Sequence, residues 1–232
     1  TSKQYAKDFI LTRDVGAVNS TVRTPDQTLA AKFWANGGGT ATPPGHWNQI
    51  ARQLIDLEGV DFEGQARLLA LMNVALADAA ISCWKTKYLY SYWRPITAIR
   101  EADTDDNRMT GKDPTWTPLL ATPPFPEYTS GHSTFSGAAA AALAVFFRTD
   151  RIAFTTASDD APGILRSFNR ISEAADEAGM SRIYGGIHFM SANQEGLKAG
   201  RAIGRYVARH LLRPVHGDHD DDEGEGDEDD ND

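Results

Sequence analysis

Three short segments of the sequence carry side chains whose types and spacing suit the binding of an oxyanion. In the first, Lys87 lies seven residues before Arg94, and two helical turns place both cations on one face of a helix. Two basic residues at this spacing are also common on a solvated helix face, and Lys85 is a nearby competitor. This segment therefore indicates an anion site only in combination with others.

The second segment runs from Tyr128 to His132, at a predicted junction between a loop and a helix. A helix N-terminus offers free backbone N–H groups to an anion, and Gly131 lets the backbone approach it closely. Ser130 can donate a hydroxyl hydrogen bond, and His132 can transfer a proton at neutral pH. An ordinary helix cap by Ser130 or Ser133, beside a surface histidine, explains the same residues equally well.

In the third segment, Arg182 lies six residues before His188, across the pair Gly185 and Gly186. This arrangement can aim a bidentate guanidinium and an imidazole at one point. A structural histidine packed beneath a helix is the alternative. A serine triad is less favoured, because the sequence lacks the Gly-x-Ser-x-Gly elbow.

Helical periodicity predicts the elements that position these segments, and strand-type alternation is almost absent. Helices are predicted at about 24–35, 44–56, 64–93, 133–147, 164–178 and 194–212, with a proline-rich surface loop at 101–126. Gly200 and Gly204 lie one turn apart, where a neighbouring helix could approach closely. We therefore expect an all-α helix bundle whose active site is built from facing helices and loop–helix junctions.

Charge and composition exclude several other classes of protein. The net charge is −9, but eleven of the 32 acids lie in residues 218–232, and the remaining 21 face 23 Lys and Arg. This balance gives no support for nucleic-acid binding. We expect one helical domain at 1–214 and a disordered acidic tail at 215–232. Cys83 is the single cysteine, which excludes a multi-cysteine metal site, and the apolar run from Gly137 to Phe147 is too short to span a membrane.

Together the segments read Lys-x6-Arg-Pro, Ser-Gly-His and Ser-Arg-x5-His, in this order. This combination resembles the vanadium-dependent haloperoxidases, within the wider superfamily of type-2 phosphatidic acid phosphatases and bacterial acid phosphatases. The resemblance spans roughly residues 78–205 and includes the runs 93–95 and 123–126. It implies a vanadate cofactor, with His188 as the vanadium ligand and His132 as the acid–base residue. The implied oxyanion-binding residues are Lys87, Arg94, Ser130, Gly131 and Arg182.

The resemblance implies oxidation of halide by hydrogen peroxide to a hypohalous species, which acts on a small organic acceptor. The same cage suits an acid phosphatase, in which His188 attacks phosphorus and His132 protonates the leaving group. A non-catalytic oxyanion-binding protein is a third reading. A homo-oligomer is left open, a secreted or periplasmic location is expected, and a family N-terminal bundle is expected to be absent because known members are generally longer.

Two residues depart from the pattern of the resembled family. Thr129 stands where the family usually has Pro, a change that a loop should tolerate. Ala192 stands four residues after His188, where the family has an Asp that orients the histidine. Ser191 or Asn193 is a candidate substitute for that carboxylate.

Two aromatic residues extend the resemblance to a halide pocket. Trp84 lies one helical turn before Lys87, and Phe125 lies seven residues before His132. Chloroperoxidase-type members resemble the chain at both places, whereas bromoperoxidase-type members carry a His at the position of Phe125. A single aromatic is more often an ordinary core residue, and it is the joint placement of the two that favours the pocket. A dry aromatic wall would leave halide poorly hydrated, which predicts easy bromide oxidation and detectable chloride oxidation.

Overall fold

The computed structural model describes residues 2–213, and its elements are almost all helices. In chain order they are α1 (Lys3–Gly16), α2 (Pro25–Phe33), α3 (Thr42–Glu58), α4 (Phe62–Tyr90), α5 (Pro95–Arg100), the 3-10 turn η1 (Ala102–Thr104), α6 (Gly131–Phe146), β1 (Phe154–Ala157), β2 (Leu165–Phe168), α7 (Ile171–Tyr184) and α8 (Met190–His210). The predicted all-α class is confirmed. The predicted acidic tail at 215–232 lies outside the described residues.

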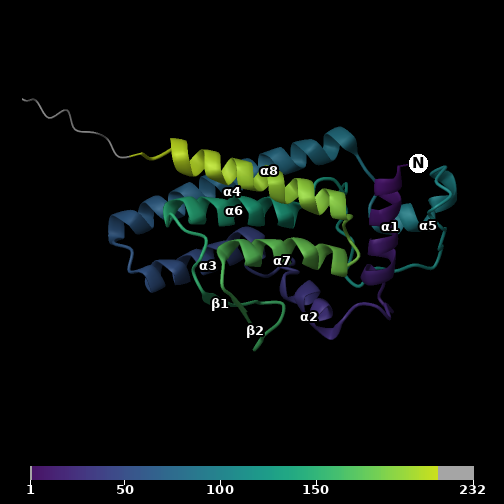
Figure 1. The fold of residues 1–232 in the computed structure, drawn as a ribbon, viewed down its shortest axis with the longest axis horizontal. Helices are drawn as coiled ribbons and strands as arrows, with labels where there is room; N and C mark the ends of the chain where they lie inside the picture. Colours follow the sequence, from purple (N-terminus) through teal and green to yellow (C-terminus); the bar gives the residue numbers. More distant parts are fainter. Residues whose placement is uncertain (1, 214–232) are drawn as a thin grey trace, which may run out of the picture.

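Helix α6 is the centre of the bundle and packs against α4, α7 and α8 (Figure 1). The N-termini of α6 and α8 lie at the same end of the bundle as the C-termini of α4 and α7, and α1 crosses that end (Figure 1). The first backbone N–H groups of two helices therefore gather in one place, and such groups have no partner inside their own helix. This end of the bundle is suited to hold an anion.

The central place of α6 follows from its small and apolar side chains, of which the run Ala138–Leu143 is buried throughout. Its neighbour α8 approaches so closely that a methyl group at Gly200 would collide with the carbonyl oxygen of Thr134, and one at Gly204 with that of Ala138. The close approach predicted from these two glycines is confirmed. It places the first two turns of α6 beside the middle of α8.

The prediction of a helix at 164–178 is wrong in its first part. Residues Leu165–Phe168 form β2, which pairs antiparallel with β1, and α7 begins only at Ile171. Gly163, at a φ of +80°, turns the chain into β2. The centroid of the Phe168 ring then lies 5.6 Å from that of the Phe154 ring, a cross-strand contact that helical periodicity does not reveal. Helices α1 and α5 were not predicted.

The stretch Phe62–Arg100 is long and apolar enough to cross a membrane by length and composition alone, with a hydropathy of 1.5. In the structure, α4 lies within this stretch and packs one side against α6 and α8. A core helix of a bundle has the same composition. The expected absence of a membrane span stays a prediction.

Candidate active site

A cavity of about 440 Å³ lies where the three predicted segments meet. Arg94, Gly131, His132, Arg182 and His188 all line it. Arg94 comes from the start of α5, Gly131 and His132 from the first turn of α6, Arg182 from the last turn of α7, and His188 from the loop before α8. The fold therefore brings these five residues, which are up to 94 positions apart in the chain, to one enclosed site.

His188 is buried, with its Nε2 atom 2.9 Å from Arg94 Nη1. A guanidinium can only donate, so Nε2 accepts this bond and the ring proton is on Nδ1. Burial, followed by the nearby cations Arg94 and Lys87, lowers the pKa of His188 well below 6.5. The ring is therefore neutral and presents a lone pair on Nε2 beside the cavity.

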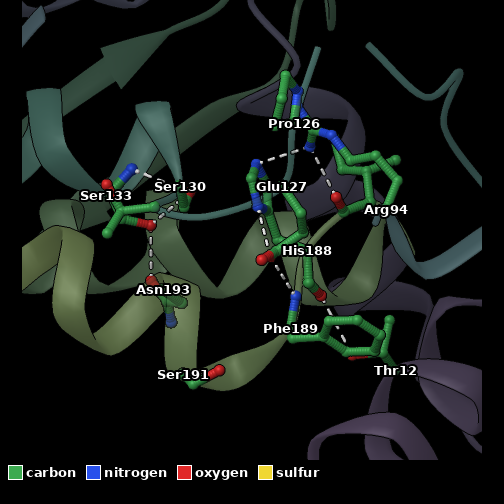
Figure 2. Close-up of polar contacts among 12 residues, drawn as sticks. Thr12, Arg94, Pro126, Glu127, Ser130, Ser133, His188, Phe189, Ser191 and Asn193 are labelled. Atoms are coloured by element: carbon green, nitrogen blue, oxygen red, sulfur yellow. Dashed lines mark hydrogen bonds and ion pairs between the residues drawn. The ribbon is translucent and has the colours of Figure 1, made fainter. Parts of the chain in front are cut away.

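Glu127 holds the other side of the His188 ring, a role that was not predicted. Its Oε1 atom accepts hydrogen bonds from His188 Nδ1 and from Phe189 N, both at 2.9 Å (Figure 2). The Glu127 side chain is buried, and burial raises the pKa of its carboxyl to about 7. A carboxylate thus reaches His188 even though Ala192 supplies none.

The two substitutes suggested by the sequence do not act in this way. The backbone N–H of Ser191 donates to Asp8 Oδ2 at 2.9 Å. The Asn193 amide oxygen accepts a 2.7 Å bond from Ser133 on α6 (Figure 2). Neither residue is a hydrogen-bond partner of the His188 ring, so that interpretation is wrong.

Arg94 has a free donor in the cavity wall. Its Nε atom donates to Phe125 O and its Nη1 atom to Ile187 O, both at 2.8 Å. The buried Nη2 atom has no hydrogen-bond partner within residues 2–213. A buried charged donor without a partner costs free energy, which an anion in the cavity would offset. The residues present therefore fit an oxyanion.

Arg182 and His132 also line the cavity. Arg182 is fully buried and donates to Ser181 Oγ at 2.9 Å and to Ala31 O at 2.8 Å, which fixes its guanidinium. His132 Nε2 lies 3.1 Å from Ala35 O, and because a carbonyl only accepts, the ring proton is on Nε2. Burial and the Arg182 charge lower the pKa of His132 well below 6.5. His132 is therefore a neutral base with its lone pair on Nδ1.

Lys87 and Ser130 do not line the cavity in the described part of the chain. Lys87 Nζ donates to the carbonyl oxygens of Pro126, Glu127 and Thr129, at 2.9, 3.0 and 2.6 Å. Ser130 Oγ caps α6 and accepts a 2.8 Å bond from Ser133 Oγ, as in the helix-cap alternative. Lys87 thus fixes the loop that carries Glu127, and direct oxyanion contacts by Lys87 and Ser130 stay predictions.

Gly131 and two aromatic residues shape the remaining wall. A Cβ atom on Gly131 would lie 3.5 Å from the Trp84 ring, so glycine leaves this part of the cavity open to the backbone. The rings of Trp84 and Phe125 both line the cavity, with centroids 5.5 Å apart. Their predicted contact with halide is sterically reasonable and stays a prediction.

Comparison with known proteins identifies a matching family and a related protein. Residues 67–217 match the family described as the VCPO second helical-bundle domain. Vanadium chloroperoxidase from Curvularia inaequalis is 32% identical, in an alignment that covers 75% of this chain and 37% of that protein.

Two solved structures show the same fold. The structure described as the first bacterial vanadium-dependent iodoperoxidase has a TM-score of 0.76 and 37% identity, covering 88% of this chain and 49% of that chain. A holo-type bacterial vanadium-dependent chloroperoxidase has a TM-score of 0.71 at 18% identity, covering 88% of this chain and 47% of that chain, and supports the fold alone. The chain spans less than half the length of these relatives. It belongs to the VCPO second helical-bundle domain family, within the vanadium-dependent haloperoxidases.

Proposed function

We propose that this chain binds vanadate in the cavity of about 440 Å³ and oxidises halide with hydrogen peroxide, as a vanadium-dependent haloperoxidase. The observation that carries this proposal is the Arg94 guanidinium. Its Nη2 atom is buried without a partner, while its Nη1 atom covers the lone pair of His188. A tetrahedral oxyanion would satisfy the free donor and meet the ring nitrogen in one position.

Each cavity residue has a role in this proposal. Arg94 and Arg182 would neutralise the oxyanion charge, and the backbone N–H of Gly131 at the start of α6 would add a directed donor. His188 would bind vanadium through Nε2. The bound vanadate would act as a Lewis acid that activates hydrogen peroxide towards halide.

His132 and the aromatic wall would complete the chemistry. His132 can accept a proton from the incoming hydrogen peroxide on the Nδ1 lone pair. It can then return this proton to the oxygen atom that hydrogen peroxide displaces. Trp84 and Phe125 would exclude water from the halide. The hypohalous product would then react with a small organic acceptor.

An acid phosphatase is the second candidate, favoured by the bond between Glu127 and His188. With its proton held on Nδ1, His188 has a free electron pair on Nε2 for attack on phosphorus. His132 would need a proton to act as the acid towards the leaving group, and the depressed pKa of His132 opposes this. Haloperoxidase chemistry, in which a neutral His132 accepts a proton first, therefore suits the site better.

One experiment separates these functions. Purified protein is incubated with orthovanadate, and peroxide-dependent bromination of a phenolic dye is measured beside hydrolysis of p-nitrophenyl phosphate. We expect bromination that depends on vanadate and disappears in His188→Ala. The matched control is His210→Ala, which removes an exposed histidine at the far end of α8.

The other outcomes of this experiment would identify one of the two alternative functions. Hydrolysis without bromination would identify a phosphatase and contradict the proposal. Vanadate binding with neither activity would identify an oxyanion-binding protein.

A further inference from the structure

We infer that Glu127 is a positioning residue that fixes the tautomer of His188 and strengthens its Nε2 atom as a ligand. The effect on vanadate rests on the proposed function, whereas the effect on the tautomer does not. Glu127 is absent from the lining of the cavity of about 440 Å³, so it acts on a bound group through His188.

Hydrogen bonds hold both the side chain and the backbone of Glu127. Its Oε1 atom accepts the Phe189 N–H at the beginning of α8 as well as His188 Nδ1. The Glu127 carbonyl oxygen accepts a 3.0 Å bond from Lys87 on α4, which holds the backbone of the same residue. Glu127 therefore joins the loop before α6 to the loop before α8, and both halves of that link are buried.

The partners on the two sides of the His188 ring permit only one neutral tautomer. A carboxylate at Nδ1 requires a donor there, and the Arg94 guanidinium at Nε2 requires an acceptor. The opposite tautomer would set a lone pair against the carboxylate and an N–H against a cationic donor. Hydrogen bonding of Nδ1–H to a carboxylate also raises the basicity of the opposite ring nitrogen.

Glu127 lines a second cavity, of about 690 Å³, whose lining includes neither Arg182 nor His132. Asp8, another buried carboxylate, lines this second cavity and bonds Gln4 and the Ser191 N–H. Asp8 makes no hydrogen bond to the His188 ring. The molecule therefore offers a matched pair of buried acids, only one of which touches the histidine.

Comparing the binding of vanadate with that of phosphate separates a positioning role of Glu127 from an effect of its negative charge. Glu127→Gln keeps the side-chain shape and an acceptor oxygen but removes the charge. We expect the vanadate Kd to rise about 10-fold, the lower end of the range for partners of metal-binding histidines. Phosphate, which relies on charge and hydrogen bonds, should bind as well as before or more tightly, because a negative charge near the anion has been removed. Parallel shifts for both oxyanions would overturn the inference.

Asp8→Asn is the control for the loss of a buried carboxylate. We expect it to change vanadate affinity by less than about twofold, since Asp8 lacks a shared partner with the bound anion. A loss as large as that of Glu127→Gln would contradict a specific role for Glu127. Glu127→Asp keeps the charge on a shorter side chain and should retain tighter vanadate binding than Glu127→Ala.

A second measurement needs no vanadate and no variant that must fold. Nitrogen-15 NMR of the unliganded parent should show His188 protonated at Nδ1 and unprotonated at Nε2 at neutral pH. A parent with the proton on Nε2 would refute the inference even if vanadate binds. A parent with the expected tautomer that fails to bind vanadate would refute the proposed function and leave the positioning role of Glu127 intact.

Discussion

Arg94 Nη1 lies 2.9 Å from His188 Nε2, so a guanidinium covers the nitrogen of the His188 ring that carries the lone pair. The same guanidinium carries the buried Nη2 atom that has no partner among the described residues. When an oxyanion enters, the Arg94 guanidinium can therefore donate to its oxygen atoms instead of to His188. The Nε2 atom of His188 is then free to bind the central atom of the oxyanion. Two predictions test the two sides of this relationship.

His188→Ala should weaken vanadate binding by at least about 100-fold, or about 2.7 kcal/mol, because the bond to vanadium is lost. Phosphate binding should fall by less than about 3-fold, since Arg94 and Arg182 remain in place. Equilibrium titration with each anion measures both values. A variant that binds vanadate as tightly as the parent would show that His188 is not the ligand.

Arg94→Lys should weaken phosphate binding by about 10- to 100-fold, because a charge-assisted hydrogen bond contributes about 1.5–3 kcal/mol. Lysine keeps the charge but lacks the planar fork that reaches both Nε2 of His188 and the cavity. Arg100→Lys is the control, because Arg100 bonds Trp116 O and does not line the cavity. Equal losses in the two variants would remove Arg94 from the anion site.

Anion binding should weaken as the pH rises through about 8. Burial lowers the pKa of Lys87 from 10.5 to about 8, so the folded protein loses this positive charge near the anion at a pH where an exposed lysine keeps it. Sulfate is the suitable probe, because its own charge is constant over this range. Isothermal titration should show a falling affinity in the parent and a flat profile in Lys87→Met. A flat profile in both proteins would contradict the prediction.

The lowered pKa of Lys87 also affects stability, and the free energy of unfolding should change with pH in the opposite direction from the anion affinity. Because the folded pKa of Lys87 is below its unfolded value, the unfolded chain holds the proton more strongly between about pH 8 and pH 10.5. The contribution of Lys87 to the free energy of unfolding should therefore rise with pH in that window. Chemical denaturation of the parent and of Lys87→Met across the window measures the difference.

Phe125→His should lower the ratio of chlorination to bromination. The Phe125 ring lines the cavity beside Trp84, and an imidazole would admit water and polar contacts to this wall. Chloride, the weaker nucleophile, should lose more rate than bromide. Both proteins are loaded with vanadate and matched for metal content before the comparison. An unchanged ratio, or one that moves towards chloride, would exclude Phe125 from the choice of halide.

Sequence patterns predicted most of the helices and the Arg and His residues that line the cavity. Helix periodicity located α4 and α8. The pair Gly200 and Gly204 predicted a close helix contact, because the absence of a side chain lets the backbone of a neighbouring helix approach. Arg94, Arg182 and His188 were predicted to converge, and they line one cavity. The helix signals depend on residues that are near one another in the chain, whereas the convergence of Arg94 and His188, 94 positions apart, was expected from the resemblance to the haloperoxidases.

Contacts that neither helical periodicity nor the three segments reveal were not predictable in the same way. β2 exists because it pairs with β1 and because Phe168 packs on Phe154 across the hairpin, and helical periodicity carries no signal for such a contact. Glu127 was missed because it lies outside the three segments, and its partner, His188, is 61 residues away. One signal was available: an acidic residue in the proline-rich approach to the Ser-Gly-His segment, in a chain where Ala192 leaves the histidine without its usual carboxylate.

The glycine contacts between α6 and α8 set the distance between these helices, and with it the distance between His132 and His188. His132 lies in the first turn of α6, and His188 lies just before α8, so the separation of these helices sets the gap that a substrate must fill. Gly200 approaches the carbonyl oxygen of Thr134, two residues after His132, whereas Gly204 approaches that of Ala138, six residues after it. Side-chain volume at Gly204 therefore adjusts the width of the site from a position away from the chemistry, giving enzyme design a control that leaves every reacting residue unchanged.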